Sequence, residues 1–162
     1  MNMSIGWAPE LETGIEIIDQ QHRQLVECLC NLSEAIDAGD IEQVRLHLHR
    51  LTDSACAHNH DENQLLYEAG YPDIDIHQRQ HQAFRVRAHA WSLQLGRDDH
   101  PLQRARQIRT ELALWLANHI EDEDRQYLPW VQRYLHPSLL QRLYGQLFAR
   151  SSHTALPQSS RH

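Results

Sequence analysis

The chain has 162 residues, of which 41% are apolar and 23% charged, a composition that is ordinary for one globular domain with its own core. Its formal net charge of -7 argues against a nucleic-acid partner, because nucleic-acid-binding domains are typically basic. It contains neither a run of about 18 apolar residues nor a basic and apolar leader, so we expect a cytoplasmic protein without a membrane span.

Four segments with apolar residues at helical spacing follow one another along the chain. The first starts near Thr13 and Glu16, which have the spacing of a capping box, and ends at Gly39. Asp40 is placed to cap the second segment, which ends at Gly70. Each of these two segments therefore has the start and stop signals of a separate helix.

The third segment follows Asp73, and the fourth follows Pro101, a residue suited to the first turn of a helix. Only six glycines and six prolines are present, which leaves little material for the many turns of an all-β fold. Four amphipathic helices joined by short connections predict an all-α fold, an antiparallel up-down-up-down four-helix bundle.

Beyond the fourth segment the pattern changes. Pro129 is expected to end or kink the fourth helix. Leucines at helical spacing predict a short additional C-terminal helix over about 137–150, and the Ser-rich residues after it are expected to be disordered. The sequence thus divides into a bundle over 1–130 and a C-terminal extension over 131–162.

Histidine is unusually frequent, with 13 residues, and imidazole is a common ligand for iron, copper and zinc. His58 and Glu62 are four residues apart, as are His77 and His81, so the members of each pair share one face of a helix. The Gly-Tyr-Pro turn at 70–72 lies between the pairs. Two consecutive antiparallel helices can therefore direct both pairs at one point, as in the metal sites of helical bundles.

His22 occupies an apolar position of the first segment, and His119 lies on the fourth. Burying imidazoles and a carboxylate in apolar stripes costs free energy unless something pairs with them. One buried histidine is more often a core residue bonded to a carbonyl. A convergent set from four helices is better explained by a metal ion.

Together these motifs resemble the hemerythrin family, most closely its single-domain bacterial members. The resemblance includes the Trp-Leu-x2-His-x4-Asp-x2-Tyr pattern at 115–127 and extends from about residue 7 to residue 127. It implies two non-haem iron ions with an oxo or hydroxo bridge. The implied ligands are His77, His81 and His119 on one iron, His22 and His58 on the other, and Glu62 and Asp124 bridging the two.

Asp124 does not follow from regular helix geometry. It is five residues after His119, about 140° around an ideal helix, whereas Asp122 and Glu123 lie closer to the buried face. The resemblance favours Asp124, which requires a local distortion of the fourth helix, and leaves Asp122 and Glu123 facing solvent. For Asp19 two roles stay open, a hydrogen bond to a ligand imidazole or an exposed helix charge.

The resemblance implies reversible dioxygen binding by a carrier, store or scavenger, and a protein that is not an enzyme. An oxygen or redox sensor that signals to a protein partner through the C-terminal helix is the alternative. An enzyme acting on peroxide or nitric oxide is a weaker one, because no separate acid, base or substrate pocket is evident. A monomer is expected. Asn59 and Asn63 differ from the phenylalanine and the acid usual in the family, which bears on oxygen affinity and autoxidation.

Helix phase also predicts an apolar lining around the site that keeps water away. The expected lining residues are Ile18, Leu25, Leu66, Leu112, Trp115 and Leu116.

Overall fold

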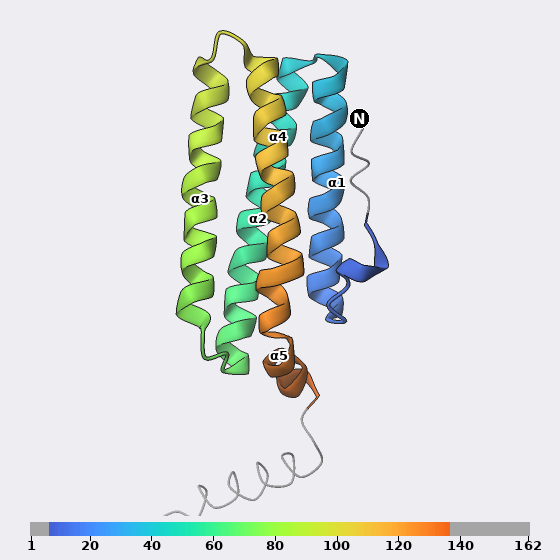
Figure 1. The fold of residues 1–162 in the computed structure, drawn as a ribbon, viewed down its shortest axis with the longest axis vertical. Coiled ribbons are helices and arrows are strands. Elements are labelled where there is room, and N and C mark those ends of the chain that lie inside the picture. Colours follow the sequence, from blue (N-terminus) through green and yellow to red (C-terminus); the bar gives the residue numbers. More distant parts are fainter. Residues whose placement is uncertain (1–6, 137–162) are drawn as a thin grey trace, which may run out of the picture.

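A computed structural model describes residues 7–136 and shows a bundle of helices over that range (Figure 1). Its four long helices are α1 (Glu16–Ala38), α2 (Ile41–Ala69), α3 (Ile74–Arg97) and α4 (Pro101–Asn118). Consecutive helices run antiparallel, and α1 also contacts α4, which closes the bundle. The short helix α5 (Leu128–Leu135) lies at the end of the bundle where α2 turns into α3. The predicted all-α four-helix bundle is confirmed.

The connections follow the predicted turn residues. Gly39 and Gly70 end α1 and α2 with φ angles of 71° and 69°, a left-handed conformation that glycine adopts at little cost. The Asp40 side chain caps α2 by accepting a hydrogen bond from the backbone N–H of Gln43 at 3.1 Å. Pro101 occupies the first turn of α4.

The start of α1 differs from the predicted capping box. Glu16 accepts a hydrogen bond from Gln20 instead of reaching back to Thr13. Asp19 takes that role: it accepts from the backbone N–H and the hydroxyl of Thr13 at 2.7 and 2.8 Å, and from the N–H of Gly14 at 3.0 Å. Asp19 is buried and bonds to the chain before the helix, so both roles considered for it from the sequence are wrong.

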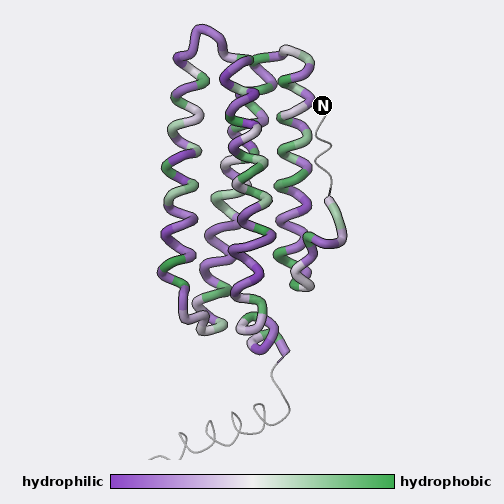
Figure 2. The backbone as a smooth tube through the Cα atoms, in the orientation of Figure 1, coloured by the Kyte–Doolittle hydropathy of each residue, from purple (hydrophilic) through white to green (hydrophobic). Residues whose placement is uncertain are grey.

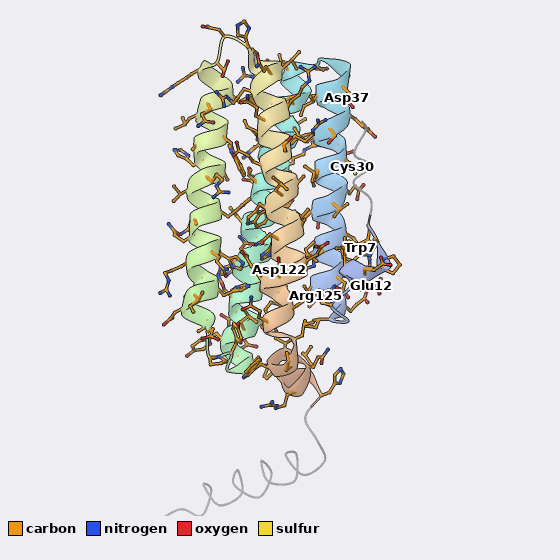
Figure 3. All side chains as sticks on the ribbon, in the orientation of Figure 1. Trp7, Glu12, Cys30, Asp37, Asp122 and Arg125 are labelled. Carbon is orange, nitrogen blue, oxygen red and sulfur yellow. The ribbon has the colours of Figure 1, made fainter. Side chains whose placement is uncertain are left out.

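An arm precedes α1 and lies along its side, where Figure 3 marks Trp7 and Glu12. It contains one turn of 3-10 helix, η1 (Pro9–Leu11). Glu12 accepts a hydrogen bond from Arg23 at 2.9 Å, and the Arg23 guanidinium lies 5.2 Å from the centre of the Trp7 ring. The Trp7 ring is 6.4 Å from the ring of His22, so the arm covers this histidine from the outside.

Apolar and polar residues alternate along each long helix (Figure 2), and the apolar ones form two clusters inside the bundle. The larger cluster extends to the end that holds the α1–α2 and α3–α4 connections, and Trp91 is among its largest buried side chains. The smaller cluster lies at the opposite end and contains Ile15, Ile18, Leu66, Tyr71, Tyr127 and Val131. Helix α5 belongs to this smaller core, because its Val131 is fully buried.

The fourth helix is not regular to its end. After α4 the residues His119–Glu123 form a wider π-helical turn, η2, and Asp124–Gln126 form a 3-10 turn, η3. Pro129 then lies in the first turn of α5. The prediction that Pro129 ends or kinks the fourth helix is therefore wrong, because the distortion begins earlier, at His119.

The predicted helix over 137–150 and the predicted disordered tail lie outside the described residues. The predicted division of the chain at residue 130 stays a prediction, and α5 spans that position. Within residues 7–136 there is no helix long and apolar enough to cross a membrane.

Candidate metal centre

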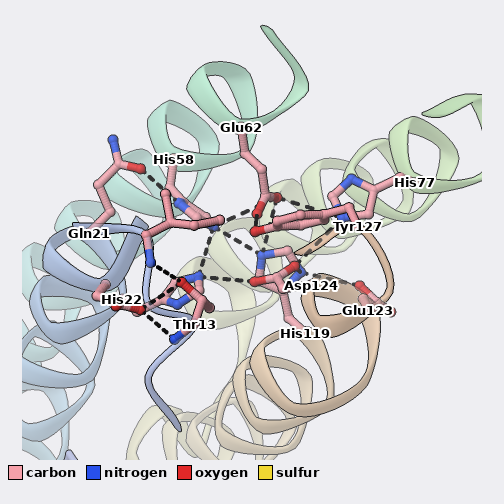
Figure 4. A network of polar contacts seen from close by, with 12 residues as sticks. Thr13, Gln21, His22, His58, Glu62, His77, His119, Glu123, Asp124 and Tyr127 are labelled. Carbon is pink, nitrogen blue, oxygen red and sulfur yellow. Dashed lines mark hydrogen bonds and ion pairs between the residues drawn. The ribbon is translucent and has the colours of Figure 1, made fainter. Parts of the chain in front are cut away.

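Seven buried polar side chains meet inside the bundle, and Figure 4 shows most of them with the polar contacts between them. Each is at most 5% exposed. They come from α1, α2 and α3 and from the turns η2 and η3 that follow α4. They are the seven residues that the sequence predicted as ligands: His22, His58, Glu62, His77, His81, His119 and Asp124. His60, two residues after His58, is exposed, as expected from helix phase.

Three of the imidazoles approach one another closely. The Nε2 atom of His58 lies 3.3 Å from Nε2 of His22 and 3.0 Å from Nε2 of His119. Burial lowers the pKa of His58 to about 3, against the opposing charge of Glu62, so this ring is neutral near pH 7. A neutral imidazole is the form that binds a metal ion.

Glu62 faces four of the histidines. Its Oε2 atom lies 3.2 Å from Nε2 of His81, 3.6 Å from His77, 3.8 Å from His119 and 3.9 Å from His58. Burial acts to raise the pKa of Glu62, but the surrounding imidazoles, His58 first, hold it well below the usual range. The carboxylate is therefore charged and central to the cluster.

Asp124 reaches the other side of the same space. Its Oδ2 atom is 3.0 Å from Nε2 of His22, and its Oδ1 atom is 3.6 Å from Nε2 of His77. Burial and the charge of Glu62 act to raise the pKa of Asp124, yet His119, His22 and His77 lower it overall. Each oxygen of this carboxylate thus faces a histidine from a different helix.

The π-turn explains how Asp124 enters the site. In an α-helix a residue five positions after His119 points about 140° away, whereas a π-turn pairs residues five apart. Asp124 is fully buried, and Asp122 is exposed, as the sequence analysis expected. The prediction that Glu123 faces solvent is wrong, because its Oε2 atom lies 3.2 Å from Nδ1 of His119 and its Oε1 accepts a hydrogen bond from Asn118.

Three of the histidines have a hydrogen-bond partner on the side away from the cluster. Such partners fix the orientation of a ligand ring and the nitrogen that it presents to a metal. The pairs are His58 with Gln21 at 3.0 Å, His81 with Asn63 at 3.1 Å and His119 with Glu123 at 3.2 Å. The sequence analysis did not identify Gln21 or Glu123 as hydrogen-bond partners of these histidines. The position of Glu123, four residues after His119, could have indicated its role.

Tyr127 was used in the sequence analysis only to align a motif, but its hydroxyl donates a short hydrogen bond to Oε1 of Glu62. The residue is fully buried and its ring packs edge-on against His77 and Tyr71. Burial and the charges of Glu62 and Asp124 raise its pKa well above the usual range. Tyr127 therefore stays protonated and holds Glu62 in place as a donor.

Apolar side chains close the site on the side of α3 and α4. The half-buried Trp115 ring stacks on the His119 ring at 5.0 Å between centres, and Phe84 stacks on Trp115 at 3.8 Å. The other five predicted lining residues are buried: Ile18, Leu25, Leu66, Leu112 and Leu116.

Several atoms of the cluster are buried without a hydrogen bond to any described residue, although ion-pair contacts surround them. These atoms are Oε2 of Glu62, Nε2 of His77 and of His81, and both carboxylate oxygens of Asp124. Buried polar atoms of this kind cost free energy unless a partner satisfies them. A cation at their centre supplies that partner, so the residues present fit a metal.

The donor atoms fall into two overlapping groups in which all atoms lie within 4.8 Å of one another. One group contains His22, His58, Glu62, His119 and Asp124, and the other contains Glu62, His77, His81 and His119. The fold and this donor set define a helical-bundle protein with a buried cation site.

Comparison with known proteins supports the same class. The family profile described as Hemerythrin HHE cation binding domain matches residues 13–131. The chain is 34% identical over 131 residues to a bacteriohemerythrin of Stenotrophomonas maltophilia, covering 80% of this chain and 82% of that protein. It is 29% identical to hemerythrin subunit beta of Lingula anatina, covering 75% and 90% of the two chains. The chain belongs to the hemerythrin family.

A solved structure of a hemerythrin variant has the same fold. It superposes with a TM-score of 0.67 at 21% sequence identity and covers 81% of this chain and 98% of that one.

Proposed function

We propose that this protein binds dioxygen reversibly at two non-haem iron ions, as a carrier, store or scavenger. The observation that carries the proposal is the pair of overlapping donor groups, in which five imidazoles and two carboxylates meet in a buried space. Iron supplies a metal that can take up and release dioxygen by a reversible change of oxidation state. Imidazole and carboxylate both suit iron as ligands.

In this proposal His77, His81 and His119 would hold one ion, and His22 and His58 would hold the other. Glu62 and Asp124 would be shared by the two ions. The contacts support this division, because Asp124 directs one oxygen to His22 and the other to His77. The ion on the His22 side would have fewer protein donors, which would leave room there for dioxygen.

Reversible binding, in preference to catalysis, is supported by the donor set. Neutral imidazoles outnumber carboxylates, so the site has little negative charge to stabilise highly oxidised iron. Leu112 and Leu116 are buried, and the Trp115 ring stacks on His119, so the α4 side presents apolar side chains.

We also propose a monomeric protein of the cytoplasm. The alternative of a sensor depends on the predicted helix over 137–150.

Anaerobic titration with ferrous iron followed by exposure to air tests the proposal. We expect two irons per chain and a visible absorption band that appears with oxygen and disappears when oxygen is removed. Binding of a single iron, or uptake of zinc with no uptake of iron, would overturn it.

A further inference from the structure

A polar pocket lies between α2 and α3, against the wall of the metal centre. Its volume is about 120 Å³, and its walls include Asn59, Asn63, His81, Gln82 and Arg85. His81 belongs both to this pocket and to the proposed ligand set. The pocket therefore extends to the back of a residue that faces the metal.

Asn59 is the least satisfied residue of the pocket. It is only 5% exposed, and its side-chain oxygen Oδ1 has no hydrogen-bond partner among the described residues. Among the neighbouring groups, Asn63 pairs with Nδ1 of His81, and one nitrogen of Arg85 donates to Gln82. A buried amide oxygen left in this state costs free energy, so a donor is required.

The space is large enough for water to be that donor. One water molecule needs a cavity of roughly 10–15 Å³ and two to four polar partners. This pocket has a volume of about 120 Å³, and several polar side chains form its walls. We infer that the pocket between α2 and α3 is a binding site for ordered water, with one molecule donating to Oδ1 of Asn59. This water would lie behind His81, whereas the rings of Trp115 and Phe84 stack beside His119.

This site has a consequence for the metal that rests on the proposed function. The shell around a metal site controls solvent access and the local dielectric. Water held at the His81 wall would bring solvent to the back of a proposed ligand ring. We therefore expect a change at Asn59 to alter the rate at which the loaded site releases its metal.

Crystal structures of the full chain, wild type and Asn59→Leu, test the inference. Leucine has the same branching as asparagine, with two methyl groups in place of the amide oxygen and nitrogen, and no polar side-chain atom. We expect an ordered water within hydrogen-bond distance of the Asn59 amide in the wild type and none at that position in the variant. A dry pocket around Asn59 in the wild-type crystal overturns the inference, whether or not the variant folds.

Release of zinc to a chelator gives a second readout that needs neither iron nor oxygen. We expect Asn59→Leu to release zinc more slowly, on the order of threefold or more. Gln64→Leu is the matched control, since Gln64 lies exposed on the same helix and bonds only to Glu68 there; its rate should equal the wild-type rate. Equal release from Asn59→Leu and wild type would contradict the inference.

The two proposals can fail separately. A hydrated pocket in a protein that takes up no iron would leave this inference standing and remove the proposed function. A dry pocket in a protein that binds oxygen reversibly would overturn this inference and leave the proposed function standing.

Discussion

In the half of the bundle that contains the candidate metal centre, the buried helix faces carry polar side chains. In the other half, the same faces carry apolar side chains. On α3 one buried face carries His77 and His81 near the start of the helix and Trp91 and Leu95 near its end. The apolar half gains free energy from burial, about 25 cal/mol for each Å² removed from water. The polar half loses free energy unless a partner satisfies its buried atoms. Burial in the apolar half thus stabilises the fold, and the polar half can serve as a binding site.

Removing one imidazole from the polar half should have the largest effect. We expect His119→Ala to lose bound metal, because the change removes a ligand shared by both donor groups and leaves a hole in a buried site. Metal analysis of the purified protein measures this. His60→Ala is the control, since His60 is exposed; metal loss in that variant would mean that the helix faces are wrongly assigned.

The turns after α4 allow a graded comparison of three neighbouring acids. Asp124→Ala should release metal, because its two oxygens face histidines of two helices. Glu123→Ala should keep the metal but weaken its binding by about 10–100-fold, since it removes the partner of Nδ1 of His119. Asp122→Ala should change stability by less than about 0.5 kcal/mol and leave binding alone.

Metal affinity of the three variants, measured by competition with a chelator, gives the ranking. A stronger effect of Glu123→Ala than of Asp124→Ala would show that the fourth helix runs undistorted through the site in solution.

A change in the apolar half should separate stability from binding. We expect Trp91→Ala to lower the free energy of unfolding by about 3–5 kcal/mol, because it leaves a cavity in the larger core and removes the bond from the indole to Glu111. The folded variant should still bind the wild-type amount of metal. Denaturant unfolding and metal analysis check the two statements, and loss of metal from the folded variant would contradict the division into halves.

Among the changes expected to weaken metal binding, removal of one buried hydroxyl should have the smallest effect. Tyr127→Phe removes the hydroxyl that holds Glu62 and should lower metal affinity by about tenfold without abolishing binding. Tyr134→Phe is the matched control, since its hydroxyl bonds to the exposed Glu68. Chelator competition on both variants gives the comparison, and equal affinities would remove the role given to Tyr127.

How far the sequence predicted the structure depends on how regular the backbone is. His58, Glu62, His77 and His81 lie on undistorted helices, so their spacing alone predicted that they would meet. The role of Asp124 came from the family resemblance, because helical spacing opposes it until the π-turn is known. Asp19 was misread because its partners belong to the irregular chain before α1.

Contacts between helices were the other limit. The hydroxyl of Tyr127 and the amide of Gln21 reach residues of α2 that are far away in sequence. No local spacing encodes such pairs. These pairs depend on the rotation of each helix about its axis, which the packing of the bundle fixes.

The central claim is that the polar half is one site for two metal ions. Anomalous diffraction at the iron edge, from crystals of the iron-loaded full chain, tests it most directly. We predict two iron peaks inside the bundle, with Glu62 and Asp124 between them and the five histidines around them. A single peak, or peaks only at exposed histidines such as His60, would contradict the account.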